Sequence, residues 1–175
     1  MKKLVVMLAV LGLLFLAADT SYARGIGIKG GYAVMGGDYA DAEIDDTPFF
    51  GVFFDAGNFL FNSLKFKPGL DYLTLKGPND TFEADVWGIH IDWYWHFLGQ
   101  TAISPFLGFG PALNLYDFKT SHESDSDAGI EGFAGCEFAI AGPFTLILEA
   151  RYVIHDIAST DTNMWKLGVG IQYNF

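Results

Sequence analysis

The sequence predicts an all-β fold: an eight-stranded antiparallel up-and-down transmembrane β-barrel that follows a cleaved signal peptide. Three observations predict it. Apolar and polar residues alternate with period two over eight segments. The connections between these segments alternate between short and long, which is typical of outer-membrane barrels. Bulky aromatic side chains fall on one row of each segment, while glycine and charge fall on the other.

The first element is the leader. Lys2 and Lys3 precede an uncharged run over 4–18, and small residues end at Ala23. A basic start, a short apolar run and small residues are the signature of a secretory signal peptide, here with cleavage after Ala23. The apolar run is shorter than the roughly 20 residues that a membrane-spanning helix needs. The predicted division is 1–23 signal peptide and 24–175 barrel.

Composition limits the classes of protein that remain. The chain has 175 residues, of which 51% are hydrophobic and 17% aromatic, so it has ample apolar surface to bury and is not disordered. Its formal net charge of -11 argues against a nucleic-acid partner. Cys136 is the single cysteine, which excludes an intrachain disulfide. Its place in the apolar row indicates a small lipid-facing residue.

Eight strands follow the leader. The last is the clearest, because Trp165, Leu167, Val169, Ile171, Tyr173 and Phe175 share one face. The predicted strands are 26–34, 48–58, 64–75, 82–97, 102–116, 129–141, 143–155 and 165–175. Short turns at 59–63, 98–101 and 142–143 separate longer polar connections after the first, third, fifth and seventh strands. An even strand number places both termini on the short-turn side.

The apolar rows are predicted to face lipid. A soluble barrel would turn these rows inward, but eight strands enclose a lumen that ordinary side chains only just fill. The segment 82–97 alone carries three tryptophans on its apolar row. Turned outward, the large rings fall into belts at the two membrane interfaces. The loop-side belt contains Trp87 and Trp165, and the turn-side belt contains Trp95, Phe97, Tyr173 and Phe175.

Four stretches carry a family resemblance: RGIGIKGGYAV, PFLGFGPALNLY, GFAGCEFAIAGPFTLILEARY and LGVGIQYNF. Over 24–175 the chain resembles the outer-membrane β-barrel domain family, the small eight-stranded barrels similar to OmpA and OmpX. The resemblance implies a Gram-negative outer membrane, with its lipid and lipopolysaccharide as surroundings. It also implies that the barrel-assembly machinery reads a C-terminal signal, here Leu167, Val169, Ile171, Tyr173 and Phe175. It implies an activity only weakly.

The inward rows carry charges of both signs. Because unpaired charges away from water are very costly, we expect an ion-pair network that fills the lumen. A narrow pathway for water or ions is the alternative, although eight strands leave little bore. The expected lumen residues are Lys29, Asp55, Lys65, Lys67, Asp71, His90, Asp92, His96, Glu131, Glu137, Glu149, Arg151, His155 and Lys166.

Other patterns suggest chemistry only superficially. His90, Asp92 and His96 share a face, but His96 lies too far along the strand to complete a metal site, so no metal is predicted. His155 resembles the histidine of lipid A deacylases, yet Ile157 stands where their serine would follow. We therefore predict no catalytic residue and no cofactor.

Two predicted loops are acidic. The first carries Asp38, Asp41, Glu43, Asp45 and Asp46, and the third carries HESDSD at 122–127. A solvated acidic surface is the ordinary outcome, while divalent cations bridging to lipopolysaccharide, or an unknown surface ligand, remain open. The leading hypothesis is a non-enzymatic barrel with a structural, surface-interaction or adhesion-type role. A narrow pore for ions or small solutes comes second, and a lipid A-modifying enzyme third.

Overall fold

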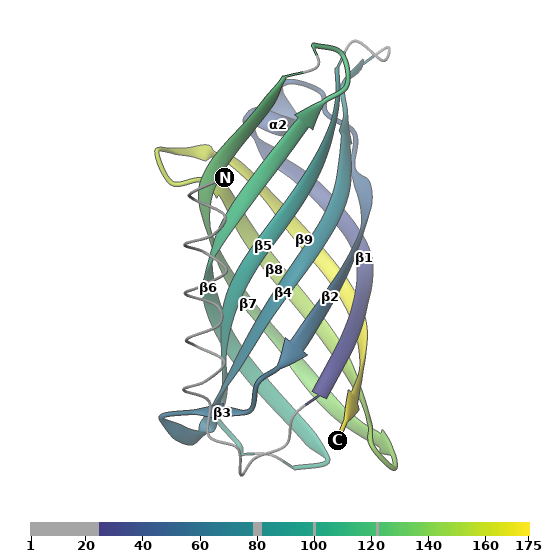
Figure 1. The fold of residues 1–175 in the computed structure, drawn as a ribbon, viewed down its shortest axis with the longest axis vertical. Helices are drawn as coiled ribbons and strands as arrows, with labels where there is room; N and C mark the ends of the chain where they lie inside the picture. Colours follow the sequence, from purple (N-terminus) through teal and green to yellow (C-terminus); the bar gives the residue numbers. More distant parts are fainter. Residues whose placement is uncertain (1–24, 79–81, 100, 122) are drawn as a thin grey trace.

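The computed structural model describes residues 25–78, 82–99, 101–121 and 123–175, so the predicted signal peptide lies outside it. These residues form eight long strands, the two-residue strand β3 and the one-turn helix α2 (Figure 1). None of the helices in this part of the chain is long and apolar enough to span a membrane. The elements are β1 (Gly25–Gly37), α2 (Asp38–Asp41), β2 (Thr47–Asp55), β3 (Asn58–Phe59), β4 (Phe61–Lys76), β5 (Glu83–His96), β6 (Ile103–Phe118), β7 (Ser124–Ala141), β8 (Phe144–Asp156) and β9 (Ser159–Asn174).

The sheet closes on itself. The long strands pair antiparallel with their neighbours in chain order, β1 pairs with β9, and pairing between β2 and β4 joins the chain across β3. Figure 1 shows the strands winding at a tilt around a tall cylinder. Closure leaves no free sheet edge, which is how strands satisfy their backbone groups in lipid. The predicted eight-stranded up-and-down barrel is confirmed.

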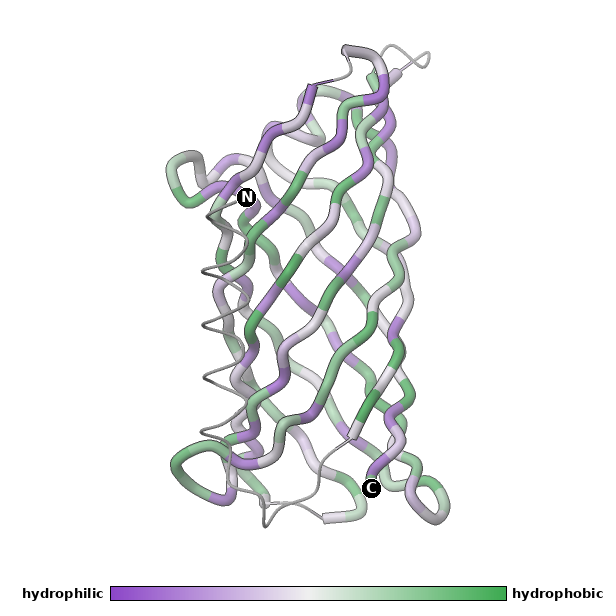
Figure 2. The backbone as a smooth tube through the Cα atoms, viewed as in Figure 1, coloured by the Kyte–Doolittle hydropathy of each residue, from purple (hydrophilic) through white to green (hydrophobic). Residues whose placement is uncertain are grey.

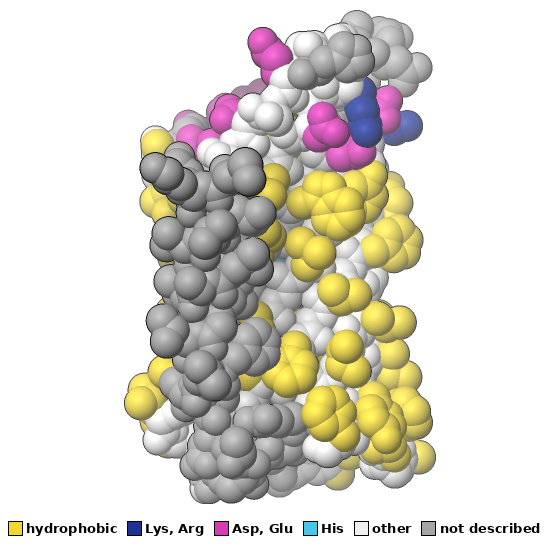
Figure 3. Space-filling view, in the orientation of Figure 1, with side chains coloured by type: hydrophobic (Ala, Val, Ile, Leu, Met, Phe, Trp, Pro, Cys, Tyr) yellow, Lys and Arg dark blue, Asp and Glu magenta, His cyan; other side chains and the backbone are white. Residues whose placement is uncertain are grey.

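The apolar rows face outward, as predicted. Ile28 is 61% exposed, Phe109 58% and Val169 53%, while the opposite rows are buried. Figure 2 shows apolar and polar residues alternating along the strands, and Figure 3 shows apolar side chains covering much of the visible wall. Acidic and basic side chains gather above them in Figure 3, at the end of the barrel that carries α2 (the loop end).

The strands on the loop side are longer than predicted. β7 begins at Ser124 rather than 129, and β9 begins at Ser159 rather than 165, so the last connection contains only Ile157 and Ala158. The acidic stretch predicted as a loop at 122–127 therefore lies mostly in β7, where Asp125 pairs with Tyr116. Beyond the lipid both faces of a sheet contact water, so no apolar alternation reveals the strand.

The second predicted strand, 48–58, is also interrupted. β2 ends at Asp55, whose carboxylate accepts a hydrogen bond from the Gly57 N–H at 2.9 Å. Gly57 has a φ of 92°, a conformation that glycine adopts without strain, and the chain turns there into β3. The ring of Phe59 then lies 6.1 Å from that of Phe66 and covers it on the outer wall.

Candidate functional site

The lumen is the candidate site, because buried polar groups are concentrated there. Near the end that carries the short turns (the turn end), four charged residues form the turn-side cluster: Asp55, Lys65, Lys67 and Glu137. Lys65 Nζ lies 2.9 Å from Glu137 Oε2 and 3.4 Å from Asp55 Oδ2. Lys67 contacts the same two carboxylates. Two positive and two negative groups therefore neutralise one another across the barrel.

Gln172 and His96 complete the surroundings of the turn-side cluster. The Gln172 amide donates to Asp55 Oδ2 at 3.0 Å and accepts from Lys67 Nζ at 3.0 Å. His96 Nδ1 lies 2.8 Å from the Ser104 hydroxyl. Hydrogen bonds to the remaining polar atoms are what make a buried ion pair tolerable.

Arg151 organises a second group of charges, the central cluster. Its guanidinium contacts Asp92 at 2.8 Å, Glu149 at 2.9 Å and Glu131. These carboxylates come from β5, β8 and β7, and the Arg151 side chain is 1% exposed. The planar guanidinium has five N–H donors in a fixed fork, so its separate nitrogens can each bind a different carboxylate. Arg151 thereby ties three strands together.

Asp71 is the other centre of the central cluster. Its carboxylate lies 3.1 Å from Lys29 Nζ, 3.2 Å from Lys166 Nζ and 3.4 Å from His90 Nε2. The second ring nitrogen of His90 lies 2.9 Å from Asp92. His90 therefore links the Asp71 and Arg151 groups into one network that draws on six strands.

Aromatic rings separate the two clusters. Phe53, Tyr94, Phe106 and Phe133 pack with Ile147 inside the barrel and form the aromatic layer. Lys67 Nζ lies 4.7 Å from the centre of the Tyr94 ring, and the Arg151 guanidinium lies 4.2 Å from that of Phe133. The rings thus contact cations of both clusters through cation–π interactions. The sequence did not predict this layer, because these strands carry aromatic residues in both rows.

An apolar plug closes the loop end. It contains Ala33, Met35, Tyr39, Phe49, Leu73, Leu75, Val86, Tyr116, Val153 and Met164. Tyr39 of α2 reaches into this plug, where its hydroxyl lies 3.1 Å from His155 Nδ1 and 3.2 Å from the Tyr116 hydroxyl. Tyr116 also contacts His155 Nδ1, at 2.8 Å.

His155 corrects one sequence expectation. It was expected in the ion-pair network, but in the described part of the chain its ring contacts two tyrosine hydroxyls and makes no salt bridge. It lies beyond Trp165 toward the loop end, outside the membrane-spanning segments. There burial lowers the pKa of His155 to about 3, and the charge of Lys166 acts in the same direction. The imidazole is therefore neutral and serves the plug rather than the network.

The residues considered for a metal are arranged differently from the sequence expectation. His96 stays with Ser104, whereas Glu131 of β7 joins His90 and Asp92, with one ligand atom from each within 4.8 Å of the others. Asp92 and Glu131 both bind Arg151. The guanidinium thus already supplies the positive charge that a metal ion would bring.

The belt residues lie on the outer wall. Near the loop end, Trp87 packs on Tyr72 with 4.8 Å between ring centres, and Trp165 packs on Tyr152 at 5.0 Å. Near the turn end, Trp95 is 50% and Phe97 47% exposed. Tyr173 on β9 and Phe175 after it are also exposed, as are Leu167, Val169 and Ile171.

Comparison with known proteins agrees with this architecture. No curated protein matches the chain significantly. Neisserial surface protein A matches with a TM-score of 0.66 and 17% identity over 87% of this chain and 97% of that one. Ail, the attachment invasion locus protein of Yersinia pestis, matches with a TM-score of 0.58 and 14% identity over 88% of this chain and 99% of that one. OprG from Pseudomonas aeruginosa matches with a TM-score of 0.57 and 15% identity over 88% of this chain and 97% of that one.

These likenesses show a shared fold. The family model for the outer membrane protein beta-barrel domain matches residues 6–175, which is nearly the whole sequence. The match supports an outer-membrane location, in agreement with the outward apolar rows. The chain therefore belongs to the outer membrane protein β-barrel domain family.

Proposed function

We propose that this protein is a closed, non-enzymatic barrel of the outer membrane that acts as a structural and surface-interaction protein. The filled lumen carries the proposal. From the turn end to the loop end, a charge cluster, the aromatic layer, a second charge cluster and the apolar plug follow one another. A pore needs continuous polar groups with room for water, and here two layers built mainly of aromatic and aliphatic side chains interrupt the charged groups.

The arrangement also argues against the enzyme alternative. A lipid A deacylase would need a nucleophile beside its histidine. His155 instead lies buried between Tyr39 and Tyr116, and Ile157 is exposed at the position expected for a serine. We infer that the outward residues Leu167, Val169, Ile171, Tyr173 and Phe175 serve assembly of the barrel rather than chemistry.

Charge at the loop end limits the surface partners. Ail, which has this fold, is an attachment invasion locus protein and has been crystallised with the heparin analogue sucrose octasulfate. The loop end of the present chain would repel such a polyanion and favour a basic protein surface. Its described acidic residues are Asp38, Asp41, Glu43, Asp45, Asp46, Glu83, Asp85, Asp117, Glu123, Asp125, Asp127, Asp156 and Asp161.

Planar-bilayer recording tests the closed lumen. We expect the protein without residues 1–23 to insert without reproducible conductance steps. Arg151→Gln removes a lumen charge and serves as the diagnostic variant, while Lys119→Gln removes an outer charge and serves as its control. Steps in the wild type whose amplitude changes in Arg151→Gln but not in Lys119→Gln would contradict the proposal and favour a narrow pore.

A further inference from the structure

The outer wall carries a furrow along the seam between β2 and β4. Pairing at this seam runs only from Phe49 with Leu73 to Phe53 with Gly69. The next residue of β4 is Pro68, which has no N–H to donate. The seam between β2 and β4 is the shortest between neighbouring long strands, and the surface is hollowed beside it.

Three adjoining depressions make up the furrow. The loop-side depression, of about 450 Å³, and the middle one, of about 380 Å³, share Phe50 and Tyr72. The middle and turn-side depressions share Val52 and Leu70. The furrow is thus continuous from the loop end down the lipid-facing wall, and below Tyr72 its walls are almost entirely apolar.

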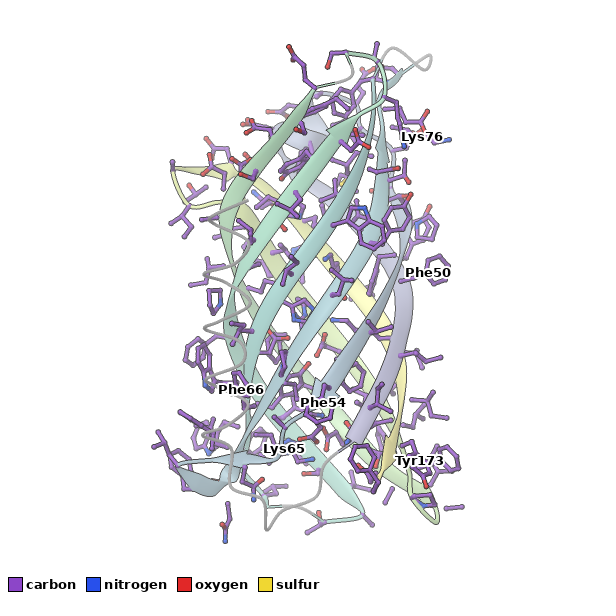
Figure 4. All side chains as sticks on the ribbon, in the orientation of Figure 1. Phe50, Phe54, Lys65, Phe66, Lys76 and Tyr173 are labelled. Atoms are coloured by element: carbon purple, nitrogen blue, oxygen red, sulfur yellow. The ribbon has the colours of Figure 1, made fainter. Side chains whose placement is uncertain are left out.

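Lys76 stands at the loop-side end of this furrow. In the described chain, Lys76 and Lys119 are the two basic side chains outside the lumen. Both lie beside Glu83, since Lys76 pairs with it across the sheet and the Lys119 N–H donates to its carbonyl. Figure 3 shows basic side chains at this edge of the loop end, and Figure 4 shows Lys76 above Phe50 on the same side of the barrel.

Only one of the two lysines is free to bind a ligand. Lys119 Nζ lies 2.6 Å from the Asp85 carboxylate, whereas Lys76 makes no ion pair with any described residue. Asp46 accepts a hydrogen bond from the Met35 N–H at 2.8 Å, and it lines the loop-side depression together with Asp45. This depression therefore offers one unpaired cation and two carboxylates above an apolar groove.

We propose that the furrow holds lipopolysaccharide of the outer leaflet, with an acyl chain along Val52 and Leu70 and a phosphate at Lys76. An acyl chain in the groove would bury its apolar surface, which would otherwise face water or looser contacts with lipid. A lysine ammonium is a good point charge for phosphate. The packed rings of Tyr72 and Trp87 mark the membrane interface just below the lysine.

The carboxylates favour lipopolysaccharide over a phospholipid. Asp45 and Asp46 would repel a bare phosphate, but they can share divalent cations with the phosphates of lipid A. The proposal does not depend on the closed lumen, because it concerns the outer wall alone.

Native mass spectrometry of the protein in detergent micelles, titrated with lipid A and Mg²⁺, tests the site. We expect Lys76→Gln to weaken binding of the first lipid A about tenfold or more, the usual effect of losing one hydrogen bond to a charged group. Val52→Trp fills the furrow and should weaken binding at least as much. Lys119→Gln is the control for charge. Leu148→Trp is the control for shape, since Leu148 lines a separate wall groove with Ala134 and Leu167.

The outcomes separate clearly. Selective loss in Lys76→Gln and Val52→Trp, with near wild-type binding in both controls, supports the site. Equal binding by all variants, or equal loss in Leu148→Trp, would overturn it in favour of unspecific adsorption to the wall. Phosphatidylglycerol binding as tightly as lipid A, with the same dependence on Lys76, would overturn the choice of lipopolysaccharide. Heat-dependent mobility on gels checks that each variant folds.

Discussion

In the lumen, large aromatic side chains pack over glycines, which have no side chain. Gly108 lies under the ring of Phe133, and a methyl group at Gly108 would overlap that ring and approach the Trp93 carbonyl oxygen to 2.5 Å. Gly27 lies under Phe53 in the same way. The inward glycines therefore leave room for the rings of the aromatic layer. Replacing one of them with a larger residue should strain that layer.

Gly108→Ala should destabilise the barrel by roughly 1–3 kcal/mol, the usual cost of overpacking a filled interior. Gly132→Ala is its matched control, because a methyl group at Gly132 meets nothing within 4 Å on the outward row of β7. Urea unfolding in detergent micelles measures both changes. Equal stabilities of the two variants would show that the aromatic layer is loosely packed.

The sequence predicted which charged residues face inward, because strict period two fixes the face of each residue once the apolar row is assigned. It did not predict their partners. Arg151 contacts Glu149 as the neighbour two residues earlier on the same face of β8. It contacts Asp92 and Glu131 because of the stagger between strands, which cannot be read from a single sequence. The aromatic layer escaped prediction for a related reason, since adjacent residues such as Phe53 and Phe54 occupy both rows.

Among the elements, the helix α2 was not predicted by the alternation. It has a single turn, too short for a helical period, and it folds over the loop end so that Tyr39 is buried against Tyr116 and His155. Burial raises the pKa of Tyr39 to about 12, so its hydroxyl stays protonated and able to donate. The helix therefore closes the barrel through hydrogen bonds with the buried, neutral imidazole of His155.

Acid should loosen this closure. An unfolded histidine takes up a proton near pH 6.5, while His155 in the folded barrel does so only near pH 3. Between these values the unfolded chain binds the extra proton, so stability falls as pH falls, by at most about 1.4 kcal/mol per pH unit. Urea unfolding at pH 7.5 and pH 4.5 measures the effect.

His155→Gln isolates this contribution from the carboxylates that titrate in the same range. Asp127 and Asp156 near the tyrosines and Lys166 below the ring are present in both proteins. We expect a smaller loss of stability on acidification in the variant than in the wild type. Identical pH profiles would mean that His155 is not held neutral in the plug.

For the whole molecule, the fold was predictable because lipid imposes two constraints together: alternation on every strand and closure of the sheet. Trp165 to Phe175 obeys the first without exception, and pairing of β1 with β9 satisfies the second. The loop-side ends were not predictable, since the constraint of lipid ends at the aromatic belt. The strands continue there by backbone pairing without a lipid-facing apolar row, as at Asp117 with Ser124.

Quenching of tryptophan fluorescence tests the orientation of the strands most directly. All four tryptophans lie on outward rows, and Trp87, Trp95 and Trp165 are 44%, 50% and 50% exposed. In bilayers of lipids brominated along their acyl chains, we expect strong quenching of each single-tryptophan variant, with little quenching by aqueous iodide. Fluorescence indifferent to brominated chains would place the rings inside the barrel and contradict the account.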